Sequence, residues 1–344
     1  MKVMHILNTG TYSGAENVVI SIITHMEKDI QCVYVSLEGS IGKILKKYNI
    51  TYYPIEKLTI LNIKRAIKDE KPDIIHAHDF TASIITSIVA NNIPVISHLH
   101  NNPPWIKKIN LKTIVYGISC LKYKKILTVS NSVMKEYIFG SRFYKKTIVV
   151  GNPIIPKDII KKSKIALKKD SYDIVYLGRF TLQKDPEKFL NIIKKLNQKI
   201  PNLKVGMIGM GEMYDFIKEK IIEMKLENVI ECLGFIDNPY GILGNSKLLC
   251  IPSRWEGFGL VAVEALSLGK PVVASNVGGL PGIIDDNSGK ICQNIDEFIT
   301  EIYMLLSNQE YYEKKSSSAR NRAEFLDNKD IYFKKIREAY IVKN

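Results

Sequence analysis

The 344-residue sequence has no uninterrupted apolar run near the ~18 to 20 residues that a bilayer-spanning helix needs. Its first residues, Met1-Lys-Val-Met-His-Ile-Leu7, lead straight into a strand pattern rather than into the layout of a signal peptide. The five cysteines are odd in number, widely spaced and without zinc spacing, which favours reduced thiols. No fixed-period repeat or low-complexity tail is present. These absences argue against membrane-spanning, disulfide-stabilised and repeat proteins and predict a cytoplasmic globular protein.

Acidic residues are scarce in the first half of the chain only. Residues 1–170 hold 26 Lys and Arg against 12 Asp and Glu, whereas residues 171–344 hold 23 of each, so the net charge of +14 belongs to the first half. The excess is steepest over residues 101–170, with 16 basic and 3 acidic residues. Such a patch attracts phosphate on nucleic acid, anionic lipid or a lipid-linked diphosphate. A solvated lysine-rich surface is the alternative.

Short apolar runs alternate with helical patterns along the whole chain, which is typical of parallel α/β proteins. In the first half the runs predict strands at 3–7, 31–37, 51–54, 74–78, 95–99, 126–129 and 147–150. In the second half they predict strands at 174–177, 204–208, 229–233, 248–251, 272–275 and 289–292. We expect two doubly wound domains, residues 1–160 and 170–328, joined through the Pro-broken, Lys-rich stretch 152–172. The C-terminal helix, within 329–344, could pack back on the first domain.

Two glutamates eight residues apart, Glu256 and Glu264, flank a Gly-Phe-Gly after the predicted strand 248–251. The pattern predicts a helix from Leu260 to Leu268, which places Glu256 in the preceding loop and Glu264 about one turn inside the helix. The amides at the helix start would stabilise an anion. A sugar nucleotide has a sugar at one end, a ribose at the other and a diphosphate between them. Two carboxylates that bind hydroxyls, with a phosphate-binding helix start between them, match that chemistry.

Ligands of doubly wound sheets bind beyond the carboxyl ends of the strands. The loop after strand 174–177 carries Arg179 and Lys184, which suit a diphosphate because Arg binds it bidentately and Lys adds a point charge. The loop after the first strand carries Gly14, where a backbone can approach a ligand closely. Neither loop has the full Gly-x-Gly-x-x-Gly dinucleotide fingerprint.

All six histidines lie in the first half. His76 and His78 end one predicted strand and His98 and His100 end the next, so each pair faces one side of its strand. The pattern leaves three interpretations open: a metal cluster with Asp79, a single catalytic or phosphate-facing histidine, or satisfied core histidines. The other two histidines, His5 and His25, have the sequence context of structural residues.

Taken together, the chain resembles a family-four retaining glycosyltransferase of GT-B fold, with two Rossmann-like domains facing each other across a cleft. The resemblance covers nearly the whole chain in the expected order. Its motifs are Ser13–Glu16, Asp73–His78, Val129–Asn131, Gly151–Pro153, Gly178-Arg179 with Lys184, Gly209–Glu212, Glu256 to Glu264, and Pro271–Gly279.

The resemblance implies roles for individual residues. The second domain would bind the nucleotide sugar and the first domain the acceptor. Arg179 and Lys184 would hold the diphosphate, Glu256 would face the donor sugar, and His100 would contact that sugar at the reacting face. The implied donor-binding residues are Gly14, Ile236 at the base, Gly257, Phe258, Gly259, Leu260 and Val261 around the sugar and phosphate, and Glu264 at the ribose. No metal or other cofactor is implied, because protein cations and helix dipoles neutralise the diphosphate.

Two departures from the family pattern stand out. Ser13 replaces a second glycine that many relatives carry in the first loop. The loop Gly278–Gly282 has glycine where relatives often place a glutamate, so no site residue is assigned there.

The implied reaction moves a hexose or N-acetylhexosamine, from a UDP-sugar in preference to a GDP-sugar, to a glycan acceptor such as a polyprenyl-diphosphate-linked one. This reaction would belong to the biosynthesis of a bacterial capsule, exopolysaccharide or O-antigen. Residues 105–125 mix lysines with Ile106, Ile109, Ile114, Ile118 and Leu121 near helical spacing, which predicts peripheral contact with the anionic inner face of the cell membrane. A core-facing helix with a lysine face outward is the alternative.

Rival functions remain at this stage. A GT-B sugar-nucleotide epimerase would bind the same donor without an acceptor. A basic nucleic-acid-binding protein would explain the charge but not the two-carboxylate loop, so nucleic acid is not expected as a partner. A nicotinamide oxidoreductase would need the missing glycine fingerprint.

Overall fold

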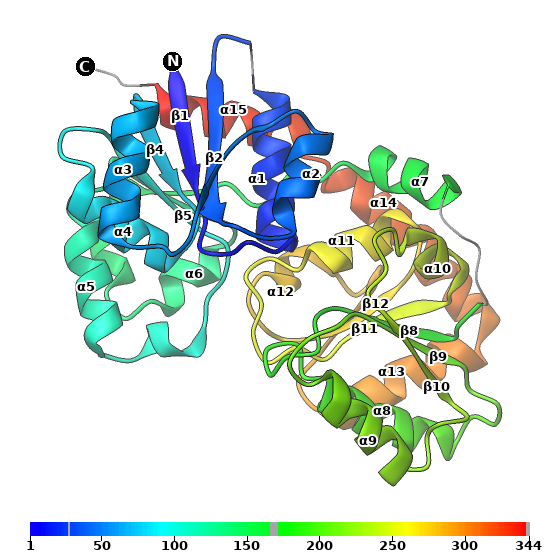
Figure 1. The fold of residues 1–344 in the computed structure, drawn as a ribbon. Helices are drawn as coiled ribbons and strands as arrows, with labels where there is room; N and C mark the ends of the chain where they lie inside the picture. Colours follow the sequence, from blue (N-terminus) through cyan, green and yellow to red (C-terminus); the bar gives the residue numbers. More distant parts are fainter. Residues whose placement is uncertain (27, 166–170, 342–344) are drawn as a thin grey trace. The chain divides into compact units, whose positions relative to one another are not determined.

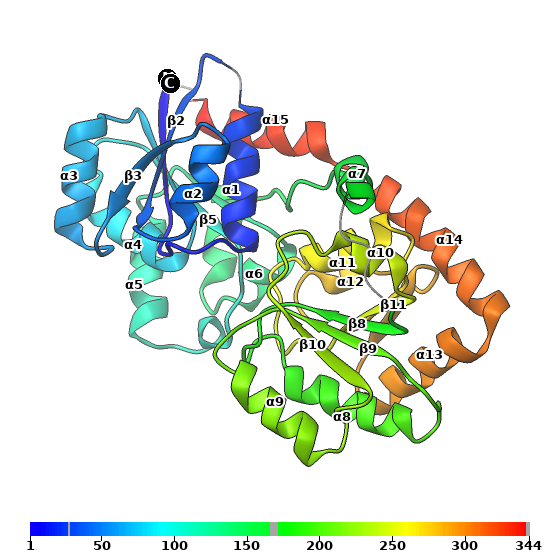
Figure 2. The same ribbon diagram turned by 45° about the vertical axis from the view of Figure 1, so that its right-hand side comes forward.

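The structure is a computed structural model that describes residues 1–26, 28–165 and 171–341 and divides into two compact units. Unit 1 comprises Met1–Pro153 together with the segment from Asn328 onward, and unit 2 comprises Ile154–Asp327. Each unit contains a parallel β-sheet with helices on both faces (Figures 1 and 2). The predicted α/β class is therefore confirmed. In the described part of the chain, no helix combines the length and apolar character needed to cross a bilayer.

Unit 1 has a seven-stranded sheet of order β3-β2-β1-β4-β5-β6-β7. Its strands are β1 (Lys2–Ile6), β2 (Gln31–Leu37), β3 (Thr51–Ile55), β4 (Ile74–Ala77), β5 (Val95–Leu99), β6 (Lys125–Thr128) and β7 (Thr147–Val149). On one face lie α1 (Gly14–His25), α2 (Ile41–Lys47) and α15 (Lys329–Tyr340), and on the other α3 (Ile60–Glu70), α4 (Phe80–Val89) and α5 (Leu111–Cys120) (Figure 1). The unit also contains η1 (Pro104–Lys107), α6 (Asn131–Glu136) and η2 (Gly140–Lys146).

Unit 2 has a six-stranded sheet of order β10-β9-β8-β11-β12-β13. Its strands are β8 (Ile174–Leu177), β9 (Val205–Ile208), β10 (Ile230–Gly234), β11 (Leu248–Ile251), β12 (Val272–Ser275) and β13 (Gly289–Cys292). One face is covered by α8 (Pro186–Asn197), α9 (Tyr214–Glu223) and α13 (Ile295–Ser307). The other is covered by α7 (Pro156–Ile165), α10 (Tyr240–Asn245), α11 (Leu260–Ser267), α12 (Leu280–Ile283) and α14 (Gln309–Phe325).

Local sequence explains these elements. The central strands are continuous apolar runs because both faces of each sheet are buried; all four residues of β9 and of β11 are buried. Several helices begin at a side-chain cap, in which Asp79, Asp185 and Asn294 accept backbone N–H bonds at the starts of α4, α8 and α13. The predicted strands therefore agree with the structure to within one residue at each end.

The strand order reverses between β1 and β4 in unit 1 and between β8 and β11 in unit 2. In doubly wound sheets this reversal opens a crevice beyond the carboxyl ends of the two strands, where ligands bind. The candidate ligand-binding loops are therefore the four that follow β1, β4, β8 and β11.

The C-terminal helix α15 packs against the sheet of unit 1. The hydroxyl of Tyr340 lies 2.8 Å from Nδ1 of His76 on β4, and the ring of Phe333 stacks on His25 of α1 at 4.5 Å between centroids. Tyr340 is completely buried, so the end of the chain supplies part of the core of its first unit.

Candidate active site

Two loops of unit 2 meet at the carboxyl ends of β8 and β11. The backbone N–H of Arg254 donates to the carbonyl oxygen of Gln183 at 2.8 Å, which joins the loops directly. The Arg254 guanidinium also pairs with the Asp185 carboxylate, with Nε 2.9 Å from Oδ2, while Asp185 caps α8. The sequence analysis named neither Asp185 nor Arg254 as a site residue. In the structure, their ion pair holds the two loops together.

The predicted ligands Lys184 and Glu256 form an ion pair. Glu256 is only 4% exposed, and its Oε1 also accepts a hydrogen bond from the hydroxyl of Ser253 at 2.9 Å. Arg179, by contrast, is exposed, and among the described residues its guanidinium has no ion pair. The ammonium of Lys184 is thus paired with a carboxylate, whereas the guanidinium of Arg179 is available to bind an anion.

The start of α11 is built from glycine and exposes backbone amides. Gly259 precedes the helix with φ +102°, a backbone conformation that favours glycine, and a Cβ there would lie 2.5 Å from Leu280 Cδ2 and force that side chain to move. The amides of Leu260 and Val261, the first two residues of the helix, have no acceptor within the helix, whereas that of Ala262 donates to the carbonyl oxygen of Gly259 at 3.0 Å. Together with the helix dipole, these free N–H groups could bind an anion next to Gly257 and Phe258.

Glu264 lies one turn into α11, as predicted, and its Oε1 accepts a hydrogen bond from the hydroxyl of Tyr240 at 2.9 Å. Desolvation raises the pKa of Glu264, and the Tyr240 bond partly opposes this rise. Beyond β10 at the same sheet edge, Ile236 is half-buried and packs against the apolar cluster that includes residues of α11.

In unit 1, Gly14 is exposed and is the first residue of α1, directly after the β1 loop. That loop is braced by Glu16, which is 2% exposed and accepts hydrogen bonds from the hydroxyls of Thr9, at 2.5 Å, and Ser13. Ser13, the departure from the family pattern, therefore has a structural partner. The bracing fixes the position from which Gly14 could approach a ligand.

Five of the six histidines lie together: His5, His76 and His98 on β1, β4 and β5, and His78 and His100 directly after β4 and β5. His5 Nδ1 lies 2.9 Å from His78 Nε2, and His78 Nδ1 lies 3.1 Å from His100 Nε2. His76 Nε2 lies 3.2 Å from His98 Nδ1. Burial lowers the pKa of His5 and of His100 to about 3, so both rings are neutral at physiological pH. A structural role for His5 is consistent with this burial, but the sequence did not predict its contact with His78, because strand register brings the two together.

Two sets of these residues have ring nitrogens within 4.8 Å of one another and could hold a metal ion: His5, His76 and His78, and His78, His98 and His100. Asp79, weighed from the sequence as a further ligand, caps α4 through Ala82 N at 2.7 Å and also accepts from Asn8 N at 3.2 Å. Its oxygens are therefore engaged elsewhere, and the N···N distances between the rings, 2.9–3.2 Å, are those of N–H···N hydrogen bonds.

Comparisons with known proteins agree with this architecture. The family model for glycosyl transferases group 1 matches residues 157–322, and that for glycosyltransferase family 4 matches residues 12–157. A glycosyltransferase of Methanocaldococcus jannaschii is 30% identical over 290 residues, which cover 74% of this chain and 71% of that protein. The UDP-Gal:alpha-D-GlcNAc-diphosphoundecaprenol alpha-1,3-galactosyltransferase of Escherichia coli is 27% identical over 263 residues, 71% of this chain and 66% of the relative.

Among solved structures, HepE of Anabaena in complex with UDP-glucose superimposes with a TM-score of 0.84 at 19% identity, covering 98% of both chains. The predicted GT-B fold is thereby confirmed.

Proposed function

Because this chain belongs to the group 1 glycosyltransferases, we propose that it transfers a hexose or N-acetylhexosamine from a nucleotide sugar to a glycan acceptor with retention of configuration. The observation that carries the proposal is the arrangement at one edge of unit 2. There, Arg179 and Lys184 share a loop, the first turn of α11 presents amides, and Glu256 and Glu264 stand on either side of that turn. The UDP-glucose bound by HepE supports UDP as the nucleotide.

The donor would lie along the edge of unit 2. Arg179 and Lys184 would bind the diphosphate and stabilise the leaving nucleotide, while amides from Phe258 to Val261 contact phosphate and sugar. The Glu264 carboxylate would accept hydroxyls of the ribose, and the backbone at Ile236 would meet the base. These protein charges would neutralise the diphosphate without a metal ion.

The remaining assignments concern the transferred sugar. Glu256 is buried beside Lys184, so it would accept a sugar hydroxyl when Lys184 turns to the diphosphate. His100, at the end of β5, would contact the sugar from unit 1, and Gly14 would allow the β1 loop to approach the diphosphate. The acceptor would bind unit 1.

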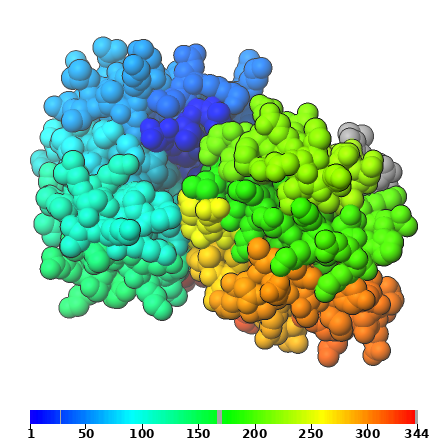
Figure 3. All heavy atoms as spheres, turned by 90° about the horizontal axis from the view of Figure 1, so that it is seen from below, coloured from blue at the N-terminus to red at the C-terminus, as the bar shows by residue number. Residues whose placement is uncertain are grey.

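A lipid-linked acceptor is the favoured class, as in the relative that acts on a diphosphoundecaprenol substrate. In support, α5 and its C-cap residue carry apolar side chains on the outside: Leu111 is 77% exposed, Ile118 59% and the C-cap Leu121 68%. The inner face holds Tyr116 and the small residues Thr113, Ser119 and Cys120. The alternative of a core-facing apolar stripe is therefore wrong for α5, although Ile106, in η1, is buried. The cyan-to-teal part of the chain that contains α5 forms part of the surface of unit 1 (Figure 3).

Exposed apolar side chains flanked by Lys107, Lys108 and Lys112 fit a membrane surface rather than water. We therefore propose that α5 holds the enzyme at the cytoplasmic face of an anionic membrane, where a polyprenyl-linked glycan of capsule, exopolysaccharide or O-antigen synthesis would be presented.

The donor assignment is tested with a panel of UDP- and GDP-sugars, scored by thermal stabilisation and by nucleotide release in the presence of lipid-linked acceptors. A UDP-sugar at a hundred times its dissociation constant is expected to stabilise the protein by about 2.7 kcal/mol. No stabilisation by any nucleotide sugar would contradict the proposed donor site. An isomerised nucleotide sugar formed without nucleotide release would favour an epimerase instead.

The membrane assignment is tested by flotation with vesicles containing anionic lipid. Because burial of one large apolar side chain is worth about 1.5–3 kcal/mol, the double variant Leu111→Gln/Ile118→Gln is expected to bind at least about tenfold more weakly. The matched control is Ile331→Gln on α15, an isoleucine of similar exposure, at 60%, which should leave binding unchanged. Equal flotation of both variants would exclude α5 as the contact.

A further inference from the structure

Unit 2 contains a cavity of about 390 Å³ that no step of the proposed reaction uses. It lies between α7, α10, α14 and the C-terminal end of α11, helices that pack against one another (Figure 2). The amides proposed to bind the donor phosphate lie at the opposite, N-terminal end of α11. Pockets that bind small molecules measure roughly 300–1,000 Å³, so the cavity is large enough for a compact ligand.

The walls of the cavity are apolar on one side and charged on the other. Ile160 of α7, Leu268 at the end of α11 and Ala323 of α14 supply apolar surface. Arg320 and Glu324 lie one turn apart on α14, and among the residues that the structure describes neither of them forms an ion pair. A ligand that fits these walls has an apolar body and a charged group.

Arg320 has a defined place at the rim of the cavity. A Cβ built on Gly269 would lie 2.5 Å from its Nε, so the missing side chain of that glycine leaves room for the guanidinium at the end of α11. Lys270 is half-buried nearby, and its pKa is lowered by burial and by the charge of Arg320. The C-terminal end of a helix offers the two cations only about half a negative charge. This end of the cavity therefore attracts an anion.

The wall formed by α10 is backbone rather than side chain, because Gly241 and Gly244 both line the cavity. A Cβ on Gly244 would meet only the two methyl groups of Leu268, at 3.9 and 4.0 Å, which is ordinary contact. Gly244 also lies outside the residues with positive φ. Neither packing nor backbone conformation requires glycine there, and the missing side chain keeps the cavity open.

Tyr240 connects the cavity with the donor site. It lines the cavity, and its hydroxyl donates a hydrogen bond to Oε1 of Glu264 at 2.9 Å. A ligand packed against Tyr240 would hold this hydroxyl on Glu264, the proposed ribose ligand. Part of the ordering that donor binding requires would then be complete before the donor arrives. Thermodynamic linkage makes such an effect mutual, so the donor would strengthen binding in the cavity by the same factor.

We propose that the cavity binds a small amphipathic anion, a carboxylate or phosphate ester on a compact apolar body, and that its occupation strengthens donor binding through Tyr240 and Glu264. The anionic group pairs with Arg320, and the apolar body packs on Ile160. Glu324 repels a second anionic group, which restricts the ligand to one. The binding site is a property of unit 2 by itself, whereas its effect on the donor rests on the proposed function.

The site is tested with the fluorescent probe 8-anilinonaphthalene-1-sulfonate, an anion with apolar rings. The full chain carries Leu111→Gln/Ile118→Gln throughout, so that the exposed face of α5 does not take up the dye. We expect one saturable site, which Arg320→Gln weakens about tenfold because a charge-assisted contact is lost. Gly244→Leu fills the cavity and should abolish binding.

The matched control is Arg65→Gln on α3 of unit 1, an exposed arginine whose removal should leave the probe bound as before. Equal affinities in Arg320→Gln and Arg65→Gln, or undiminished binding in Gly244→Leu, would overturn the site.

The coupling is tested by the affinity for UDP with and without saturating probe. Bound probe is expected to tighten UDP binding about fivefold, the lower end of the usual range for coupled sites. Tyr240→Phe keeps the ring that lines the cavity but lacks the hydroxyl, so it should bind the probe and lose the enhancement. An unchanged UDP affinity would refute the coupling, and a weakened one would place the probe in the donor site and overturn the proposal. Arg320-dependent probe binding by a protein that does not bind UDP would contradict the proposed function and uphold the cavity site.

Discussion

Replacing Lys184 with methionine is expected to lower kcat for sugar transfer about a hundredfold to a thousandfold, the range found when one preorganised charge-stabilising donor is removed. Negative charge develops on the diphosphate as the sugar leaves, and Lys184 and Arg179 are the cations of the loop that follows β8. Methionine keeps most of the length and apolar stem of lysine but cannot compensate that charge. Nucleotide release at saturating donor measures the loss.

The ion pair with Glu256 makes a stability control necessary. Lys184→Met leaves a carboxylate that is 4% exposed with only the Ser253 hydroxyl as partner, which should cost about 1–3 kcal/mol of unfolding free energy. Adding Glu256→Gln removes the unpaired charge and should restore most of that stability without restoring transfer. Recovery of transfer in the double variant would show that the single variant had failed by misfolding.

A matched pair of the same chemistry lies away from the site. Lys2 and Glu70 form a half-buried ion pair of 2.6 Å in unit 1, at the start of β1 and therefore at the opposite edge of its sheet from the loops that follow β1 and β4. Lys2→Met/Glu70→Gln should retain full kcat. If Lys184→Met kept more than about a tenth of the wild-type kcat, the assignment of Lys184 to the leaving group would be wrong.

The fold could be predicted from the sequence because each strand and helix has a local cause. Strands such as Leu248–Ile251 are buried on both faces and therefore read as uninterrupted apolar runs. Ligands of doubly wound sheets bind at loops beyond the strand ends, so Arg179, Lys184 and Glu256 could be named as candidates from order and spacing. The structure places all three beyond the carboxyl ends of β8 and β11.

Pairings between distant residues could not be predicted in the same way. The contact of Asp185 with Arg254 depends on how closely two loops approach, and the contact of His5 with His78 depends on the register of β1 on β4. Helical spacing identified the apolar stripe of α5, but the same spacing fits a face turned inward or outward. Only the packing of Tyr116 into the core decides that the stripe faces outward.

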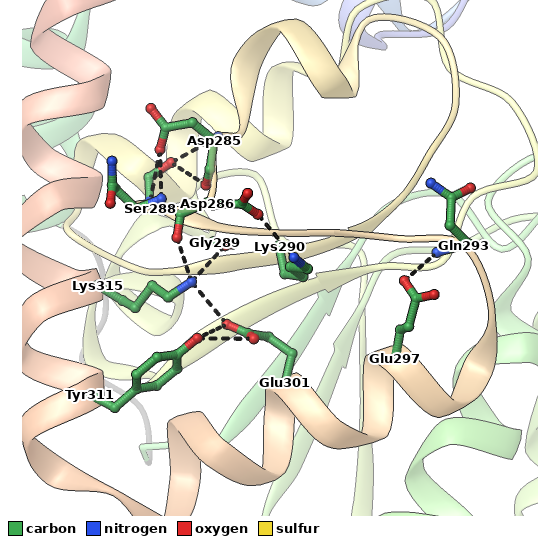
Figure 4. Close-up of polar contacts among 11 residues, drawn as sticks. Asp285, Asp286, Ser288, Gly289, Lys290, Gln293, Glu297, Glu301, Tyr311 and Lys315 are labelled. Atoms are coloured by element: carbon green, nitrogen blue, oxygen red, sulfur yellow. Dashed lines mark hydrogen bonds and ion pairs between the residues drawn. The ribbon is translucent and has the colours of Figure 1, made fainter.

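Lys315→Met is expected to lower the free energy of unfolding of unit 2 by about 3–5 kcal/mol, the cost of breaking a buried ion pair from one side. Lys315 on α14 is 6% exposed, and its Nζ lies 3.1 Å from Oε1 of Glu301 on α13. It also donates to the carbonyl oxygens of Asp286, at 2.7 Å, and Gly289, at 2.9 Å (Figure 4). One ammonium therefore ties two helices to the start of β13, and its removal leaves a buried carboxylate and two carbonyl groups without that donor.

The chain offers a reporter and two controls for this measurement. Of its two tryptophans, Trp255 lies in unit 2, so urea unfolding followed by fluorescence in a Trp105→Phe background reports on unit 2 alone. Lys290→Met removes the exposed partner of Asp286 and should change stability by no more than about 0.5 kcal/mol.

The second control is the double variant Lys315→Met/Glu301→Gln. It should recover much of the loss, because the amide oxygen introduced by Glu301→Gln can still accept the hydrogen bond that the Tyr311 hydroxyl donates to Glu301 at 3.0 Å, and no unpaired charge remains buried. A cost below about 1 kcal/mol for Lys315→Met alone would mean that water reaches Glu301 when the lysine is absent. In that case the anchoring of α13 and α14 to β13 would have to come from their apolar contacts with the sheet rather than from this ion pair.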